Sequence, residues 1–224
     1  MKKLLIIGGP GNATVIGDTV IDANRRGSRE YEFCGYINDR DGLKEISGMP
    51  VMGGLKDIDK LIEDDYYFIF SIYKFDCQDE RIRLFDSLKI PDERLAIFVH
   101  PTAYVSHNVE LSPGCVIMPN VSVTSNTRFG KSVIVRPGTT IGHDNIIGAH
   151  TSITAGASIG SCINIGEGSF IGLKACIREY LTLGKYSMAA MGAVIVKDIG
   201  EGELWGGNPA KLMRIAKWKE VAST

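Results

Sequence analysis

Long apolar runs, paired cysteines and a dominant charge are all missing from this sequence of 224 residues. Its opening, MKKLLIIGG, holds an apolar run of four residues, which is too short for the core of a signal peptide and for a membrane span. Five cysteines without a CxxC pair indicate reduced thiols in a cytoplasmic protein. The net charge of −1 gives no reason to expect binding to nucleic acid or insertion into a membrane.

The first part of the chain, residues 1–98, alternates short apolar runs with amphipathic stretches. The predicted strands are 4–8, 32–38, 66–73 and 95–99, and the predicted helices are 15–26, 54–63 and 79–88. This alternation predicts a small parallel α/β sheet of the Rossmann-like kind. Ligands of such sheets bind at the carboxyl ends of the strands, where this chain carries Gly8–Asn12 and Asn38–Arg40.

The second part, residues 99–224, follows a period of six. The sixteen apolar positions are Val105, Leu111, Ile117, Val123, Phe129, Val135, Ile141, Ile147, Ile153, Ile159, Ile165, Ile171, Ile177, Leu183, Ala189 and Ile195. Glycine often follows them, which we interpret as a residue that permits corner dihedral angles. An unbroken hexapeptide period predicts a β-helix. Three hexads form one triangular coil, so residues eighteen apart should stack, with the aliphatic side chains inward.

Six motifs carry a resemblance that covers nearly the whole chain. They are IIGGPGN, GYINDR, HPTAYVS, IGHDNIIG, AVIVKDI and WGGNPAKLMR. With the hexads, they resemble the sugar acyltransferases of the left-handed β-helix superfamily, and within it the bacillosamine and perosamine N-acetyltransferases and the sialic-acid O-acetyltransferases. The resemblance implies a left-handed coil, a homotrimer, acetyl-CoA as co-substrate, a nucleotide-sugar substrate and an active site between two prisms. No metal is expected.

The pair His143-Asp144 is the candidate catalytic dyad. Ile141 should point inward, so His143, two residues later, should lie on an outer corner. Acyl transfer needs a base for the attacking amine or hydroxyl, and histidine titrates near neutral pH. An adjacent carboxylate can hold the tautomer and stabilise the imidazolium. Taken alone, the two residues fit a solvated surface pair better than a catalytic one; the repeat, the position of His143 and the GGNPAK ending reverse that preference and favour the base.

The remaining site residues follow from the resemblance and are less specific. Substrate contacts are expected at Gly9, Pro10, Gly11, Asn12, Asp39 and Arg136. Coenzyme contacts are expected at Ser152, Gly160, Ser161, Gly172, Ala190, Gly207, Asn208, Pro209 and Lys211. Two departures stand out: Ser152 occupies a position where relatives often carry a second histidine, and Arg136 one where they often carry asparagine. Glycine amides at a helix start suit a phosphate, although Pro10 removes one donor. Ser125 and Ser161 should stack on either side of His143 and offer oxyanion donors.

The function expected from these features is acetyl-CoA-dependent N-acetylation of a nucleotide-linked amino sugar in surface-glycan synthesis. The nearest alternative is O-acetylation of a sugar such as sialic acid, with the same base. A second alternative is a zinc enzyme of the gamma carbonic anhydrase type, suggested by the 36-residue gap from His107 to His143. The seven-residue gap from His143 to His150 is longer than the spacing in that family, whose members also lack the N-terminal α/β part. A third is a scaffold without catalysis. The basic stretch KLMRIAKWKE is expected to form a packing helix.

Overall fold

A computed structural model describes residues 1–73 and 75–216. The N-terminal part forms one sheet of order β3-β4-β2-β1-β5, in which all pairs are parallel except β3 with β4. The strands are β1 (Lys2–Ile7), β2 (Tyr31–Ile37), β3 (Glu45–Ile46), β4 (Met49–Gly53) and β5 (Tyr66–Phe70). The helices are α1 (Asn12–Arg25), η1 (Leu55–Asp57), α2 (Ile58–Glu63), α3 (Gln78–Ser87) and η2 (Asp92–Arg94).

The sequence predicted most of these elements, with three differences. The edge hairpin β3–β4 was missed, because its strands are short and one of them contains Pro50. β5 ends at Phe70, three residues before the end of the expected strand 66–73. The expected strand 95–99 is reduced to a single bridge between Phe68 and Leu95 in the first sheet, followed by β6 (Phe98–Val99) in the next part of the fold.

The predicted β-helix is present, and its register is the predicted one. Each inward position from Val105 to Ile195 is the second residue of a two-residue strand. The strands are β7 (Tyr104–Val105), β8 (Glu110–Leu111), β9 (Val116–Ile117), β10 (Ser122–Val123), β11 (Arg128–Phe129), β12 (Ile134–Val135), β13 (Thr140–Ile141), β14 (Ile146–Ile147), β15 (Ser152–Ile153), β16 (Ser158–Ile159), β17 (Asn164–Ile165), β18 (Phe170–Ile171), β19 (Cys176–Ile177), β20 (Thr182–Leu183), β21 (Met188–Ala189) and β22 (Val194–Ile195). Partners stand eighteen residues apart, as in Val123 with Ile141.

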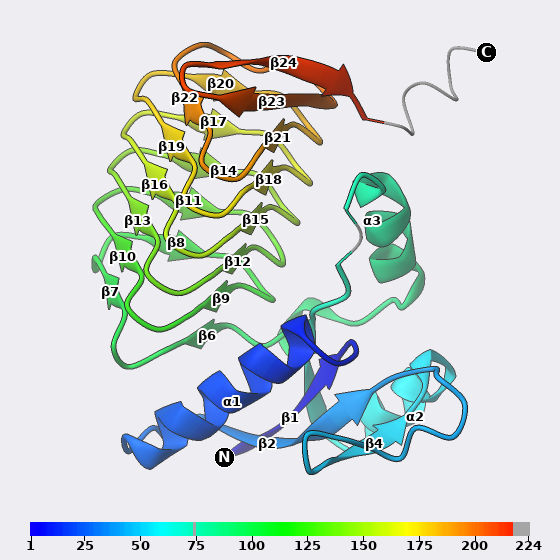
Figure 1. The fold of residues 1–224 in the computed structure, drawn as a ribbon. Coiled ribbons are helices and arrows are strands. Elements are labelled where there is room, and N and C mark those ends of the chain that lie inside the picture. Colours follow the sequence, from blue (N-terminus) through cyan, green and yellow to red (C-terminus); the bar gives the residue numbers. More distant parts are fainter. Residues whose placement is uncertain (74, 217–224) are drawn as a thin grey trace, which may run out of the picture.

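Three sheets make the sides of the prism (Figure 1). The first face is β7, β10, β13, β16, β19 and β22; the second is β8, β11, β14, β17 and β20; the third is β6, β9, β12, β15, β18 and β21, extended by two later strands. We call the bend from the first to the second face the dyad corner (residues 124–127, 142–145 and 160–163). The bend from the third to the first face is the hairpin corner (residues 136–139, 154–157, 172–175 and 190–193).

Glycine follows many inward positions for a reason other than the expected one. A Cβ on Gly142 would lie 2.6 Å from the Gly160 carbonyl oxygen in the next coil. Gly142 has no left-handed φ, whereas the corner positions that do include Asn126 (φ 59°) and Asp144 (φ 57°). The glycines that directly follow inward positions therefore permit the close approach of successive coils. The left-handed corner positions are taken by other glycines, such as Gly138, and by residues such as Asn126 and Asp144, which tolerate that conformation.

The third face is the one covered by the N-terminal part. Its outward residues Val116 and Ile134 are buried in one cluster with Ile16 of α1 and with Phe98. The elements β1–β5 lie at the lower end of the coils, and α3 lies beside them (Figure 1). None of the helices in the described part of the chain has the length and apolarity that crossing a membrane requires.

The prediction of a packing helix at the end of the chain is wrong for the residues that the structure describes. β23 (Glu203–Gly207) pairs with β21 and turns back into β24 (Ala210–Ile215). The last coil leaves unpaired backbone groups along the third face, and a hairpin satisfies them where a helix could not. Residues 217–220 of the predicted helix lie outside the described residues.

Candidate active site

The dyad corner exposes a histidine that is bonded to a carboxylate. His143 and Asp144 lie between β13 and β14, and His143 Nδ1 is 2.6 Å from Asp144 Oδ2. The side chains are 54% and 48% exposed, so an approaching substrate can reach the imidazole. The hydrogen bond with His143, followed by one from Asn126, lowers the pKa of the Asp144 carboxyl. Asp144 is therefore an anion that can orient the ring.

Two asparagines continue this corner downward and were missed by the sequence analysis. Asn126 Nδ2 donates to Asp144 Oδ1 over 3.0 Å, and Asn108 Nδ2 donates to Asn126 Oδ1 over 2.6 Å. The three residues stand eighteen apart and so occupy the same place in successive coils. The residues eighteen and thirty-six positions before Asp144 in the sequence are these two asparagines, so the stacking rule alone would have identified them. The ladder holds the carboxylate in place from below.

Asn145 is a third residue that the sequence analysis did not single out. Its side chain is fully buried, and Nδ2 donates to the carbonyls of Gly142 (2.8 Å) and Gly160 (2.9 Å). Oδ1 accepts the N–H of Ile163 over 2.8 Å. The sequence could have indicated this residue. The equivalent corner positions mostly carry small or β-branched side chains, and Asn145, directly after the dyad, is an exception to that pattern. Asn145 clamps the loop that carries His143.

Ser161 and Cys162, from the coil above, complete the surroundings of the dyad. Ser161 Oγ accepts the backbone N–H of His143 over 3.1 Å. The thiol of Cys162 belongs to a group with His143 and Asp144 whose donor atoms all lie within 4.8 Å of one another. Gly160 N–H is already bonded to the Ile177 carbonyl. Of the two serines expected as oxyanion donors, Ser161 lies directly against the His143 backbone, whereas Ser125 Oγ lies 3.5 Å from Ser106 Oγ in the coils below.

The other three histidines have different environments. His100 is buried and its Nε2 lies 3.1 Å from Asp22 Oδ2, and burial lowers its pKa. His150 is buried at the third corner against the ring of Phe85, and burial lowers its pKa to about 4. His107 is exposed in the lowest coil. Only His143 combines an exposed ring with a carboxylate partner.

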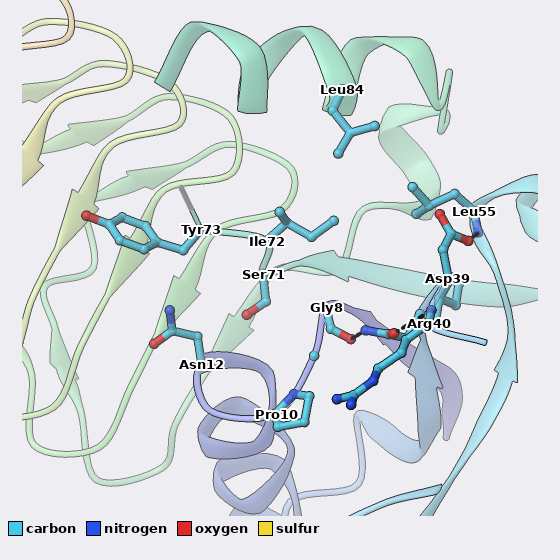
Figure 2. A pocket seen from close by; sticks show the side chains of 13 residues that line it. Gly8, Pro10, Asn12, Asp39, Arg40, Leu55, Ser71, Ile72, Tyr73 and Leu84 are labelled. Carbon is cyan, nitrogen blue, oxygen red and sulfur yellow. Dashed lines mark hydrogen bonds between the residues drawn. The ribbon is translucent and has the colours of Figure 1, made fainter. Parts of the chain in front are cut away.

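The expected substrate loop lines a cavity of about 480 Å³, which we call the glycine-loop pocket (Figure 2). Its walls include Gly9, Pro10, Asn12 and Asp39. Gly11 is the N-cap of α1 with φ 97°, and the first turn of α1 carries no acidic residue, so its free amides face the cavity without competition. Asp39 already accepts the Leu55 N–H over 2.7 Å through Oδ1, which leaves Oδ2 for a ligand.

A smaller cavity of about 250 Å³ adjoins the first one; we call it the arginine pocket. It shares Asn12 and Tyr73 with the glycine-loop pocket and reaches the third face at Arg136, Ser152 and Phe170. The tyrosine ring lies 5.4 Å from that of Phe170. Arg136, expected to bind substrate, and Ser152, expected to contact coenzyme, therefore lie in one cavity beside the substrate loop.

The other expected coenzyme residues fall at two separate places. Gly160 and Ser161 lie at the dyad corner. Gly172 and Ala190 lie at the hairpin corner, beside an apolar groove of about 490 Å³ that includes Leu173 and Met191. The Ala190 N–H donates to the Trp205 carbonyl of β23. Gly207 ends β23, Asn208 and Pro209 form the turn with a cis bond between them, and Lys211 is the second residue of β24.

One chain does not bring the dyad and the substrate pockets together. The dyad corner joins the first and second faces, whereas the arginine pocket adjoins the third face, which lies opposite that corner in a triangular prism. The glycine-loop pocket is lined by residues of the N-terminal part and meets the arginine pocket at Asn12 and Tyr73. The predicted site residues thus form two half-sites on opposite sides of the same coils.

Comparison with solved structures supports the same architecture. The chain is 29% identical to the acetyltransferase domain of PglB from Neisseria gonorrhoeae, solved with acetyl coenzyme A, with a TM-score of 0.81 over 95% of this chain and 99% of that one. It is 25% identical to PerB from Caulobacter crescentus, solved with CoA and GDP-perosamine, with a TM-score of 0.78 over 95% of this chain and 97% of that one. WeeI from Acinetobacter baumannii, 22% identical with a TM-score of 0.78 over 94% of this chain and 99% of that one, shares the fold.

Neither a family model nor a curated protein sequence matches the chain. The structural neighbours nevertheless confirm the left-handed β-helix after a small α/β sheet and the resemblance to hexapeptide-repeat sugar acyltransferases. With the resemblance, they confirm the predicted enzyme class, an acyltransferase.

Proposed function

We infer that this chain transfers the acetyl group of acetyl-CoA to the amino group of a nucleotide-linked sugar, for surface-glycan synthesis. The observation that carries the inference is the exposed His143 ring bonded to Asp144 on an outer corner of the β-helix. The PglB domain was solved with acetyl coenzyme A, and PerB with CoA and GDP-perosamine. Between them, these similar structures contain both kinds of substrate that the proposed reaction needs.

His143 acts as the general base. Because Nδ1 faces the Asp144 carboxylate, the neutral ring carries its proton there and presents Nε2 to the amine. The amine attacks the thioester carbonyl as Nε2 removes its proton, and the charged ring is stabilised by Asp144. The departing CoA thiolate then takes the proton from Nε2 of the charged ring, which returns His143 to its neutral form. Ser161, beside His143, is the proposed donor to the tetrahedral oxyanion.

The chain divides its binding tasks between residues 1–98 and 99–224 in this proposal; the boundary falls inside β6. The amides at the start of α1 bind the diphosphate of the nucleotide-sugar, and Asp39 binds its nucleoside. The pantetheine of acetyl-CoA lies along the apolar groove at the hairpin corner. Gly9→Leu, which fills the glycine-loop pocket, should raise KM for the nucleotide-sugar and leave KM for acetyl-CoA unchanged.

A homotrimer joins the two half-sites. The outward residues of the second face include Glu110 and Arg128, and the third face is covered. Outward residues of the first face are mostly small and uncharged, such as Ser122, Thr140 and Ser158, so this face can approach a threefold axis closely. The dyad corner of one subunit then meets the hairpin corner of the next.

Subunit complementation tests this assembly. Homotrimers of His143→Ala and of Gly9→Leu should each be nearly inactive, whereas trimers reassembled from a mixture of the two should recover activity. Recovery is expected because some sites then combine an intact dyad with an intact substrate pocket. A mixture that stays as inactive as its components would contradict a site shared between subunits.

The zinc alternative finds no support in the described residues. His150 is buried against the ring of Phe85, so its imidazole does not face a subunit interface where an ion could be shared with His107 and His143. The free cysteines and the proposed substrates fit a protein that works in the cytoplasm.

The direct test is acetyl transfer itself. The purified chain is incubated with acetyl-CoA and a panel of UDP-, GDP- and dTDP-linked amino sugars, and free CoA thiol and product mass are followed. One acceptor should gain one acetyl group as an amide that survives hydroxylamine. An ester that hydroxylamine removes would identify O-acetylation instead, and the absence of any acetylated product would contradict the proposal.

A further inference from the structure

The arginine pocket contains a guanidinium with no counter-ion. Arg136 follows β12 at the hairpin corner and is largely withdrawn from water, and that burial lowers the pKa of its guanidinium. Within residues 1–73 and 75–216, no carboxylate or hydrogen-bond acceptor pairs with its side chain; Tyr73 is the one titratable group that acts on it. A desolvated charge of this kind is unfavourable unless a ligand compensates it.

Tyr73 contributes a second unused donor to the same cavity. Its hydroxyl is buried and, within the described part of the chain, has no hydrogen-bond partner, while its ring packs beside Phe170. Buried polar groups are normally satisfied, so each exception calls for an explanation. Figure 2 shows Tyr73 and Asn12 turned toward the β-helix, away from Asp39. Two donors therefore converge on the arginine pocket without an acceptor between them.

The charges around the pocket do not cancel the arginine. Arg81 is buried, acts on Tyr73 as a second positive charge, and donates to the His150 carbonyl, which is neutral. The nearest acids along this segment are engaged elsewhere, Asp76 with Arg214 and Asp79 with Arg83. The cavity therefore carries net positive charge and suits an anion.

The position of the arginine pocket indicates which bound molecule would carry the anionic group. Asn12 is the first residue of α1 and lines both cavities. A nucleotide-sugar whose diphosphate lies at the start of α1 would place its next groups in the arginine pocket. We propose that Arg136 and Tyr73 bind an anionic oxygen at the sugar end of the substrate: either a carboxylate on the sugar ring or the phosphate joined to it. This inference rests on the proposed function.

The test is calorimetric titration of the full-length protein with matched probes. The neutral probes are UDP-glucose and GDP-mannose, their carboxylate counterparts are UDP-glucuronate and GDP-mannuronate, and glucuronate 1-phosphate reports on the pocket without a nucleoside. The proteins are wild type, Arg136→Gln, Arg136→Lys and Tyr73→Phe. Arg25→Gln, on the exposed end of α1, is the matched control for loss of one positive charge.

A ring carboxylate predicts tighter wild-type binding of the uronate in each pair, and Arg136→Gln should weaken that probe about 10- to 100-fold and erase the preference. A sugar-linked phosphate predicts equal binding within each pair and an equal weakening of both by Arg136→Gln. In either case Tyr73→Phe and Arg136→Lys should lose less binding affinity than Arg136→Gln, and Arg25→Gln should bind almost as tightly as wild type. Either pattern supports the anion site.

Two results would overturn it: Kd values within twofold of wild type for every probe in Arg136→Gln and Tyr73→Phe, or no binding of any probe. The outcome is separable from the proposed function. Binding that depends on Arg136 without any acetyl transfer would support the anion site and contradict the proposed function. Acetyl transfer together with unchanged binding in Arg136→Gln would support the proposed function and contradict the anion site.

Discussion

Asn145→Ala removes the side chain that holds the loop carrying His143, and the hydrogen bonds of that side chain set the expected loss of stability. The side chain makes three hydrogen bonds, but the Gly142 carbonyl keeps a second donor, Thr127 Oγ1, at 3.0 Å. Two backbone groups, the Gly160 carbonyl and the Ile163 N–H, lose their side-chain partner. At about 1–3 kcal/mol for each unsatisfied buried group, the free energy of unfolding should fall by about 3 kcal/mol. For a chain of this size that corresponds to about 6–12 °C in Tm.

Urea and thermal unfolding at fixed protein concentration measure this loss. Asn164→Ala, on the exposed second face, is the control and should stay within about 0.5 kcal/mol of wild type. Asn145→Asp separates hydrogen bonding from packing, because a carboxylate of nearly the same shape would face two carbonyl oxygens. It should destabilise at least as much as alanine at neutral pH. A stable Asn145→Asp protein, or an alanine variant that loses less than about 1 kcal/mol, would refute the clamp.

Three further predictions concern the dyad and the buried histidine. Asn126→Ala should lower kcat about 3- to 10-fold in the CoA-release assay, and combining it with Asp144→Asn should add little, because both act on one carboxylate. Asp144→Asn alone should lower kcat less than His143→Ala, because the base survives. Because the folded-state pKa of His150 is lowered from 6.5 to about 4, stability is complete above about pH 6.5 and falls toward pH 4. The loss of about 3 kcal/mol, measured by urea unfolding, should be absent in His150→Phe.

The sequence predicted the β-helix to the residue because its physical cause is local. An apolar side chain must point inward every six residues to fill a prism of constant width. The period from Val105 to Ile195 therefore specifies the strands and corners directly. His143 followed from the same register, since its place depends only on Ile141. The final hairpin was missed because pairing with the open end of the third face outweighs the helical pattern of the stretch after Pro209.

The arginine pocket could not be predicted from the sequence. Tyr73 and Arg136 are distant in the chain, and they meet only because the N-terminal part packs against the third face. No periodicity encodes that packing. The two half-sites have the same origin: the register predicts where His143 and Arg136 stand on the prism, whereas the covering of the third face decides that one chain holds them apart.

The measurement that bears most directly on the central claim is the turnover of His143→Ala with acetyl-CoA and the acceptor sugar nucleotide. A positioned base contributes about 10²- to 10⁴-fold, so kcat should fall by that factor. KM for acetyl-CoA should stay near the wild-type value, because the role proposed for the imidazole concerns the proton, and the pantetheine is proposed to lie in the apolar groove at the hairpin corner. The His107→Ala protein, which loses an exposed histidine without a carboxylate partner, should retain most of the wild-type turnover. Near-wild-type turnover of His143→Ala at neutral pH would contradict the assignment of His143 as the base.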